Sequence, residues 1–181
     1  MNTFIITPDT KTLTTFEYDG QVNSIYTLFS SILIDSSDSL KQHTIHTDAY
    51  ATDNGETPFF IGEKLFLGRA LVCGINGYEE VSASITQDEL LELINYEVND
   101  FYLHCLSALS QAKISINQTF NISHNDEKIQ LSYEWVIFTF NMADLRTQSY
   151  FLDKLDDVIA KKENIGAYFQ EMAKLALNAS S

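Results

Sequence analysis

The sequence predicts an α+β fold in which an antiparallel sheet of hairpins packs against a long amphipathic helix, followed by a helical C-terminal end. Asn76-Gly77 separates two strand-like runs, and this dipeptide favours a tight hairpin because both central residues need positive φ. Residues 86–112 combine a helix-start signal with an apolar stripe at helical spacing. Strand and helix patterns interleave up to residue 140, and the remaining chain is helical in pattern.

The first third of the chain predicts a hairpin and a helix. Residues 4–7 and 11–18 are expected to be strands joined by Pro8-Asp9-Thr10, where proline presets φ for a turn. Asn23 is a predicted N-cap for a helix over residues 24–34, which carries apolar residues on one face. The polar segment that follows this helix, residues 35–39, is expected to be a loop.

Residues 44–83 predict a run of short strands. The candidates share apolar and β-branched residues between turn signals. They are residues 44–50, 58–61, 64–66, 69–75 and 78–84. Asp53-Asn54-Gly55 and Asn76-Gly77 are the predicted turns between them.

The long helix over residues 86–112 is the element on which the other expectations depend. Thr86 and Glu89 have the spacing of a capping box, in which each side chain accepts a hydrogen bond from a free backbone N–H. Its apolar stripe recurs at steps of three and four and comprises Leu90, Ile94, Val98, Phe101, Cys105 and Leu109. The opposite face is acidic and polar, so we expect one side to cover a sheet and the other to face water.

The last third predicts a second hairpin and two helices. Residues 114–122 and 129–140 are expected to pair around residues 124–127, since the return strand is rich in β-branched and aromatic residues. Asp144 is a predicted cap for a helix to about residue 162, and a last helix is expected over residues 166–178. We therefore predict an acidic α+β core over residues 1–112. Residues 113–181 are predicted to form the hairpin and C-terminal helices, packed on the same domain.

The cysteine content and the apolar segments indicate the cellular compartment. Two cysteines, Cys73 and Cys105, are too few for a disulfide framework, and the N-terminus lacks the basic region of a signal peptide. No apolar run reaches the length of a membrane span. These observations predict a cytoplasmic protein without a membrane partner.

The net charge of the chain is unusually negative. The chain has 25 acidic and 11 basic side chains, a net charge of −14, and residues 1–110 hold 16 of the acidic and 4 of the basic residues. Direct binding of nucleic acid or an anionic membrane is disfavoured, because phosphates would meet like charge. A basic, Lys/Arg-rich protein or ribonucleoprotein surface is the favoured partner.

Several residues suggest chemistry but lack a complete pattern. A metal site is suggested by His43, His46 and Asp48, because imidazole and carboxylate groups bind zinc. On a strand only His46 and Asp48 would share a face, and two ligands are too few, so we predict no metal site. Cys73 is expected to be a buried core residue rather than a nucleophile, because no histidine is placed beside it by sequence. Gly68, like the other glycines, does not belong to a phosphate-binding spacing. We predict no catalytic residue, no cofactor and no enzyme.

Residues 48–96 resemble a family of small, uncharacterised proteins carried by phages, plasmids and other mobile elements. The resemblance lies in Asp53-Asn54-Gly55, residues 58–62, residues 67–74 and the Ser84-Ile85-Thr86 helix entry. With the N-terminal strands it covers roughly residues 1–100, and the region after Ala112 departs from the family. It implies a mobile-element setting and supplies no catalytic residues.

The acidic side chains are the predicted partner-binding residues. Those expected on the strands and on the long helix are Asp53, Glu56, Glu63, Glu79, Glu80, Asp88 and Glu92. A surface of this kind can compete for a groove that normally binds nucleic-acid phosphates. The expected function is a non-enzymatic inhibitor of a host nucleic-acid-binding defence complex, of the anti-CRISPR or anti-restriction type. The alternative is a structural or assembly protein that forms a homodimer or larger oligomer through its aromatic C-terminal region.

Overall fold

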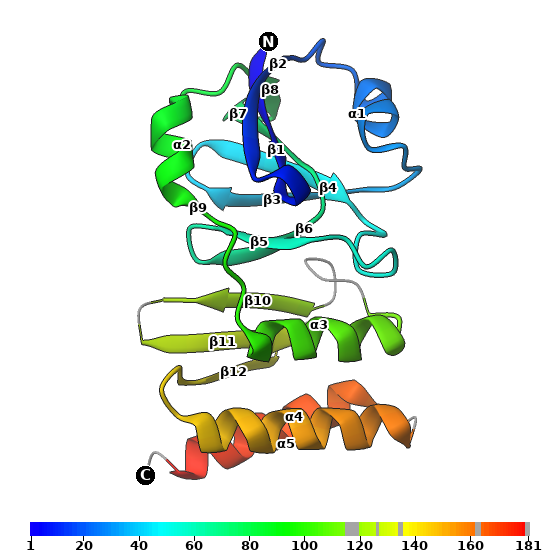
Figure 1. Ribbon diagram of the computed structural model, residues 1–181, viewed down its shortest axis with the longest axis vertical. Helices are drawn as coiled ribbons and strands as arrows, with labels where there is room; N and C mark the ends of the chain where they lie inside the picture. Colours follow the sequence, from blue (N-terminus) through cyan, green and yellow to red (C-terminus); the bar gives the residue numbers. More distant parts are fainter. Residues whose placement is uncertain (115–119, 126, 134–135, 162–163, 180–181) are drawn as a thin grey trace. The chain divides into compact units, whose positions relative to one another are not determined.

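The computed structural model has an α+β fold, as the sequence predicts, and divides into two compact units (Figure 1). It describes residues 1–114, 120–125, 127–133, 136–161 and 164–179. Unit 1 is Met1–Val98 and unit 2 is Asn99–Ser181. The division falls inside the stretch that was expected to be one helix.

The main sheet of unit 1 is antiparallel and has β7 at its centre. Its strands are β1 (Asn2–Thr7), β2 (Thr12–Glu17), β3 (Ile34–Leu40), β4 (His43–Asp48), β7 (Ala70–Asn76) and β8 (Glu79–Val81). The order is β2-β1-β7-β4-β3, and β8 pairs with the end of β7. The predicted hairpins β1–β2 and β7–β8 are confirmed, the first through a short 3-10 helix, η1 (Pro8–Thr10). The second turns at Gly77-Tyr78 and not at the predicted Asn76-Gly77, because Asn76 still pairs with Glu79, and of these residues Gly77 alone has positive φ, at 65°.

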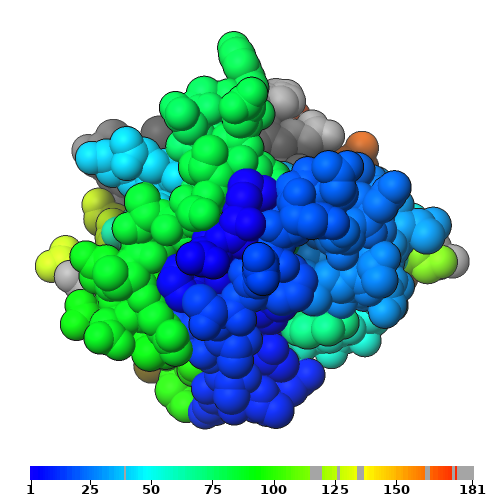
Figure 2. All heavy atoms as spheres, turned by 90° about the horizontal axis from the view of Figure 1, so that it is seen from above, coloured from blue at the N-terminus to red at the C-terminus, as the bar shows by residue number. Residues whose placement is uncertain are grey.

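The two faces of β7 belong to two apolar clusters, because successive side chains of a strand point to opposite sides. Ala70 and Val72 contribute to the larger cluster, which also includes Phe59 and Phe66 of the second sheet and Leu90 of α2. Leu71 and Cys73 face the other side and contact residues of α1 (Val22–Phe29). Figure 2 shows α1 and α2 regions on opposite sides of the β1–β2 hairpin.

A smaller sheet completes unit 1. In this unit β6 (Lys64–Leu67) pairs with β5 (Pro58–Ile61), and β5 pairs with β9 (Ile94–Asn95), all antiparallel. The β5 and β6 strands are almost wholly buried, so they supply apolar residues to the larger cluster. Gly62, in the turn between them, donates its N–H to Leu93 O at 2.8 Å.

The prediction of one long helix was wrong. The stretch forms α2 (Gln87–Leu93) and α3 (Asp100–Gln111), with β9 between them. The capping box of Thr86 and Glu89 is confirmed, but Ile94 leaves the helical conformation to pair with Ile61 of β5. Sheet pairing thus overrides a continuous helical stripe, and Asn99 caps the new helix α3.

Two smaller predictions were also wrong. The helix expected over residues 24–34 ends at Phe29, because Ser30 adopts a left-handed conformation at φ 54°. The expected loop over residues 35–39 is part of strand β3. This polar strand lies at the edge of the sheet, where its exposed face meets water.

In its described residues, unit 2 consists of an antiparallel β-meander and three helices. Its strands β10 (Phe120–His124), β11 (Lys128–Tyr133) and β12 (Val136–Asn141) pair in sequence order. The helices are α3, α4 (Leu145–Ala160) and α5 (Ile165–Ala179). The strand expected over residues 129–140 is two strands, and part of the strand expected from residue 114 lies outside the described residues. The predicted cap of Asp144 is confirmed, since it accepts the Thr147 N–H.

The core of unit 2 is aromatic. Phe151 lies at its centre and contacts Phe101, Phe138, Phe140, Tyr168 and Phe169. All six side chains are buried. The aromatic C-terminal region therefore forms an interior in the described part of this unit.

Gly74 gives a test of how closely the chain at the end of β8 approaches β7. A Cβ atom at this position would overlap the carbonyl oxygen of Ser82, a backbone atom that cannot rotate away. We expect Gly74→Ala to lower the free energy of unfolding by about 1–3 kcal/mol, measured by urea denaturation. Gly166→Ala in α5 is the control, because its nearest neighbours are side chains that can move. Equal stability of the Gly74→Ala and native chains would contradict the close approach of the Ser82 carbonyl to Gly74.

Candidate functional site

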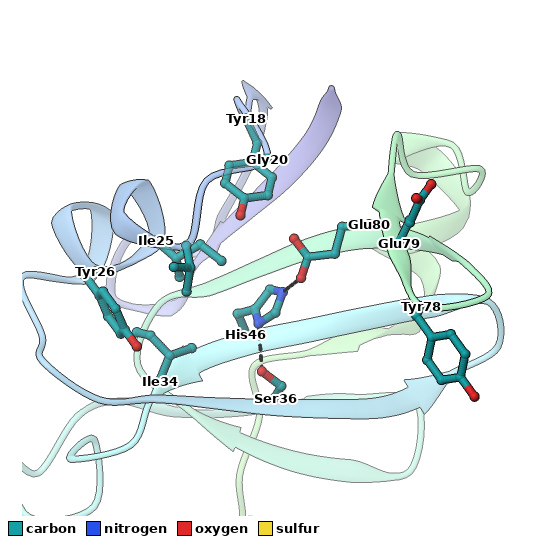
Figure 3. Close-up of a pocket in the computed structure, with 11 residues that line it drawn as sticks. Tyr18, Gly20, Ile25, Tyr26, Ile34, Ser36, His46, Tyr78, Glu79 and Glu80 are labelled. Atoms are coloured by element: carbon teal, nitrogen blue, oxygen red, sulfur yellow. Dashed lines mark hydrogen bonds and ion pairs between the residues drawn. The ribbon is translucent and has the colours of Figure 1, made fainter.

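A pocket of about 650 Å³ opens on the α1 side of the main sheet in unit 1 (Figure 3). It is bounded by the segment that leads into α1, by α1 itself, and by β3, β4 and β8. The lining residues are Tyr18, Gly20, Val22, Ile25, Tyr26, Ile34, Ser36, His46, Tyr78, Glu79 and Glu80.

A chain of hydrogen bonds crosses the base of this pocket. His46 Nδ1 lies 2.9 Å from Ser36 Oγ, and His46 Nε2 lies 2.6 Å from Glu80 Oε1. Figure 3 shows the imidazole between the two partners, each contributed by a different strand. His46 is only 5% exposed, so these contacts hold its ring in one orientation.

Strand register explains why these residues meet. His46 on β4 is opposite Leu71 on β7, and Ser36 on β3 is opposite His46. Glu80 on β8 is opposite Ile75, four residues further along β7 than Leu71. Since side chains two residues apart share a face, all of them lie on the same side of the sheet.

Cys73 lies beneath the same group. It stands between Leu71 and Ile75 on β7, is fully buried, and its Sγ lies within 4.8 Å of ligand atoms of His46 and Glu80. Burial, with a smaller effect of the Glu80 charge, raises the pKa of the Cys73 thiol to about 12. The thiol is therefore protonated at neutral pH and is not an activated nucleophile.

Tyr18 completes the polar base of the pocket. Burial, followed by the charge and the hydrogen bond of Glu80, raises the pKa of the Tyr18 hydroxyl. The hydroxyl is therefore a neutral donor at physiological pH. In Figure 3 it points toward the His46 and Glu80 pair.

The other two candidate residues of the sequence lie elsewhere. His43 is buried on the opposite face of β4, where its Nε2 lies 3.2 Å from the backbone N atoms of both Ser84 and Ile85. It holds the connection from β8 to α2 and has a structural role. Asp48 accepts hydrogen bonds from Ser31 Oγ and from the Tyr50 N–H, so it orders the loop after β4.

Of the residues considered for chemistry, the structure thus brings together His46 and Cys73 but neither His43 nor Asp48. Ser36 and Glu80 complete the group and were not assigned to it by sequence. Residues 46, 73 and 80 lie on three strands, so only the register of those strands could reveal their proximity. Asp48, which was expected to share a strand face with His46, makes its hydrogen bonds to Ser31 and Tyr50.

The predicted acidic residues fall into three groups within unit 1. Asp53 and Glu56 lie in the loop between β4 and β5, and Glu79 and Glu80 lie on β8 at the pocket. Asp88 and Glu92 are exposed on α2. Glu63 belongs near the end of α2, because the Gly62 N–H donates to Leu93 O.

Six of these seven carboxylates make no ion pair in the part of the chain that the structure describes. The exception is Glu80, which pairs with His46. The other ion pairs there involve Glu97, Asp156 and Asp157. The negative charge at Asp53, Glu56, Glu63, Glu79, Asp88 and Glu92 is consequently not neutralised by a neighbouring side chain.

No family model matches this chain, and comparisons with curated proteins and with solved structures find no match. Within the described ranges, no helix is both long enough and apolar enough to cross a membrane.

The raised pKa of Cys73 predicts a loss of stability at high pH. Between pH 9, the ordinary pKa of the thiol, and about 12, the unfolded chain loses a proton that the folded chain retains. The free energy of unfolding should therefore fall as pH rises through this range, and Cys73 should contribute nothing to the slope below it. Urea denaturation at about pH 8 and about pH 10.5 measures the loss.

The variant Cys73→Ala should lose less stability than the native chain over the same pH interval. Ile45→Val is the control, because it alters the core on the other face of the sheet without removing a titratable group. An unchanged pH dependence in Cys73→Ala would contradict the burial of a protonated thiol.

Proposed function

We propose that unit 1 is a non-enzymatic, acidic interaction module that occupies a basic surface on a host nucleic-acid-binding protein or ribonucleoprotein. The observation that supports this is the unpaired charge on and beside α2. Asp88, Glu92 and Glu63 are all exposed, and none has an ion-pair partner among the described residues.

The local environment of α2 strengthens its negative field. Glu89 adds a carboxylate in the first turn, where it is held by the backbone N–H and the hydroxyl of Thr86. These bonds lower the pKa of Glu89, so it stays ionised. The described residues of this short helix carry no basic side chain, so the helix is acidic along its exposed side.

Glu80 does not belong to this surface in our proposal. Its carboxylate is directed at His46 and is partly buried, with 29% of its side chain exposed. Asp53 and Glu56 also lie apart, at the opposite end of β5 from Glu63. The interaction surface is therefore the α2 group, defined here as Glu63, Asp88 and Glu92.

The mobile-element resemblance supplies the biological part of the proposal. In that setting, a protein that displaces DNA from a host defence complex would protect the element. We propose an anti-CRISPR or anti-restriction role in the cytoplasm, carried out by competition for phosphate-binding lysines and arginines.

The alternative role in assembly used the aromatic C-terminal region as its contact surface. The rings that pack around Phe151 are buried within unit 2, so they present no aromatic surface to a second copy. Sedimentation over a concentration series would support this alternative if a tight oligomer formed.

Competition with DNA tests the proposed role. Purified guide-RNA-loaded CRISPR effectors and restriction endonucleases are mixed with a fluorescent DNA duplex and increasing amounts of the chain. We expect release of DNA from at least one complex, with weaker inhibition as salt rises from about 50 to about 300 mM because exposed charges are screened. Asp88→Lys with Glu92→Lys should weaken the inhibition at least tenfold.

The matched control is Asp153→Lys with Glu171→Lys on unit 2, which reverses two exposed charges and changes net charge equally. It should retain inhibition. Circular dichroism confirms that α2 persists in the test variant, since a lysine in the first turn opposes the helix dipole. Equal inhibition by both double variants would contradict the role of α2, and retention of DNA by every complex would contradict the proposed function.

A further inference from the structure

Three donor atoms of different chemistry meet below the pocket of unit 1. They are an imidazole nitrogen of His46, the Sγ of Cys73 and a carboxylate oxygen of Glu80, all within 4.8 Å of one another. Among the described residues this is the only such group of three or more. The set includes two buried side chains, so it differs from the exposed carboxylates of the α2 group.

We propose that His46, Cys73 and Glu80 bind a single zinc ion. Zinc accepts nitrogen, sulfur and oxygen ligands in one tetrahedral site, whereas calcium and magnesium prefer oxygen ligands alone. A thiolate in the set therefore selects against the hard cations. This function is separate from the proposed interaction through α2.

The second nitrogen of His46 supports this assignment. Metal-binding histidines commonly donate their other ring N–H to a fixed acceptor, which sets the ring orientation and the tautomer. Ser36 Oγ, at 2.9 Å from Nδ1, is placed to accept that proton. Nε2 is then directed toward Glu80 and away from Ser36.

The ligands need only a small adjustment. The 2.6 Å separation of Nε2 and Oε1 is a hydrogen bond, whereas two ligands of a tetrahedral zinc ion lie about 3.3 Å apart. Glu80 can supply the difference, because its side chain is flexible and β8 is a three-residue strand paired with β7. His46 and Cys73 lie on the inner strands β4 and β7, and Sγ, which lies within 4.8 Å of the other two ligand atoms, would lie about 3.5 Å from each of them around a zinc ion.

Zinc binding has a defined proton balance. Bonds form from zinc to Nε2, to Sγ and to Oε1, and the S–H bond of Cys73 breaks with release of its proton to solvent. His46 changes tautomer: Nε2, which shares a proton with Glu80, gives up that proton to solvent and binds zinc. Nδ1 takes up a proton from solvent and donates it in a hydrogen bond to Ser36 Oγ. Zinc binds the thiolate form of cysteine, so the thiol proton of Cys73 is the proton released on binding.

The fourth position of the zinc ion would face the pocket. Three protein ligands plus one open position is the arrangement of reactive zinc sites, whereas structural sites usually have four protein ligands. His46 and Glu80 line the pocket, and the Tyr18 hydroxyl lies beside them as a neutral hydrogen-bond donor. The open position therefore suits water or an anionic small molecule.

Metal titration of the tag-free, full chain tests the site. Calorimetry with zinc chloride should give one ion per chain. Cobalt chloride should produce the near-ultraviolet charge-transfer absorption of a cobalt–thiolate bond, and added zinc should remove it. Cys73→Ser should abolish this absorption, and Glu80→Gln should weaken zinc affinity by about tenfold or more.

Each variant has a matched control. Cys105→Ser removes the other buried thiol, and Glu79→Gln removes the neighbouring carboxylate on β8, and both should bind zinc as the native chain does. Glu79 is exposed, and Glu80 keeps 29% of its side chain exposed at the pocket, so glutamine at either position leaves the apolar core unchanged and keeps the test decisive if Cys73→Ser unfolds. Absence of zinc binding by the native chain, or equal losses in Glu80→Gln and Glu79→Gln, would overturn the proposal. None of these variants alters α2, so this test and the DNA competition can fail independently.

Discussion

The register of β7 against its neighbours is the constraint on which unit 1 depends. β7 pairs with β1, β4 and β8, and its alternating side chains enter two different apolar clusters. A slip of one residue would exchange Val72 with Cys73 between those clusters and would expose one set of core residues to the wrong face. The same register places His46 and Glu80 on the face of Cys73. The register of β7 therefore determines both the packing of the two apolar clusters and the position of the polar group below the pocket.

Local signals in the sequence were sufficient for the elements that local interactions determine. Asn76-Gly77 predicted a hairpin and Thr86 with Glu89 predicted a capping box, since turns and caps are set within a few residues. The predictions that were wrong concern segments whose structure is determined by pairing with a distant strand. Ile94 continues the helical stripe of the sequence but pairs with β5, and the polar segment of β3 is held as a strand by β4. Neither partner can be identified from the segment alone.

The candidate site shows the same limit. Cys73 and His46 were each examined by sequence, but Glu80 was assigned to an exposed acidic surface and Ser36 to a loop. Their convergence requires four strands to align, and residues so far apart in sequence carry no periodic signal. The acidic residues also separate by environment: Glu80 is bound to His46, whereas Asp88 and Glu92 remain exposed on α2. The acidic residues behind the net negative charge are thus of two kinds. One kind is hydrogen-bonded inside the protein, and the other is exposed to a partner.

The most direct measurement of this account is anomalous diffraction at the zinc edge from crystals of the full chain grown with zinc. We predict one strong peak in unit 1 bonded to His46 Nε2, Cys73 Sγ and Glu80 Oε1. The metal distances should be about 2.0–2.2 Å to nitrogen and oxygen and about 2.3 Å to sulfur. A peak bound only by exposed carboxylates, or no peak at the base of the pocket, would contradict the claim that the register of β7 builds a metal site.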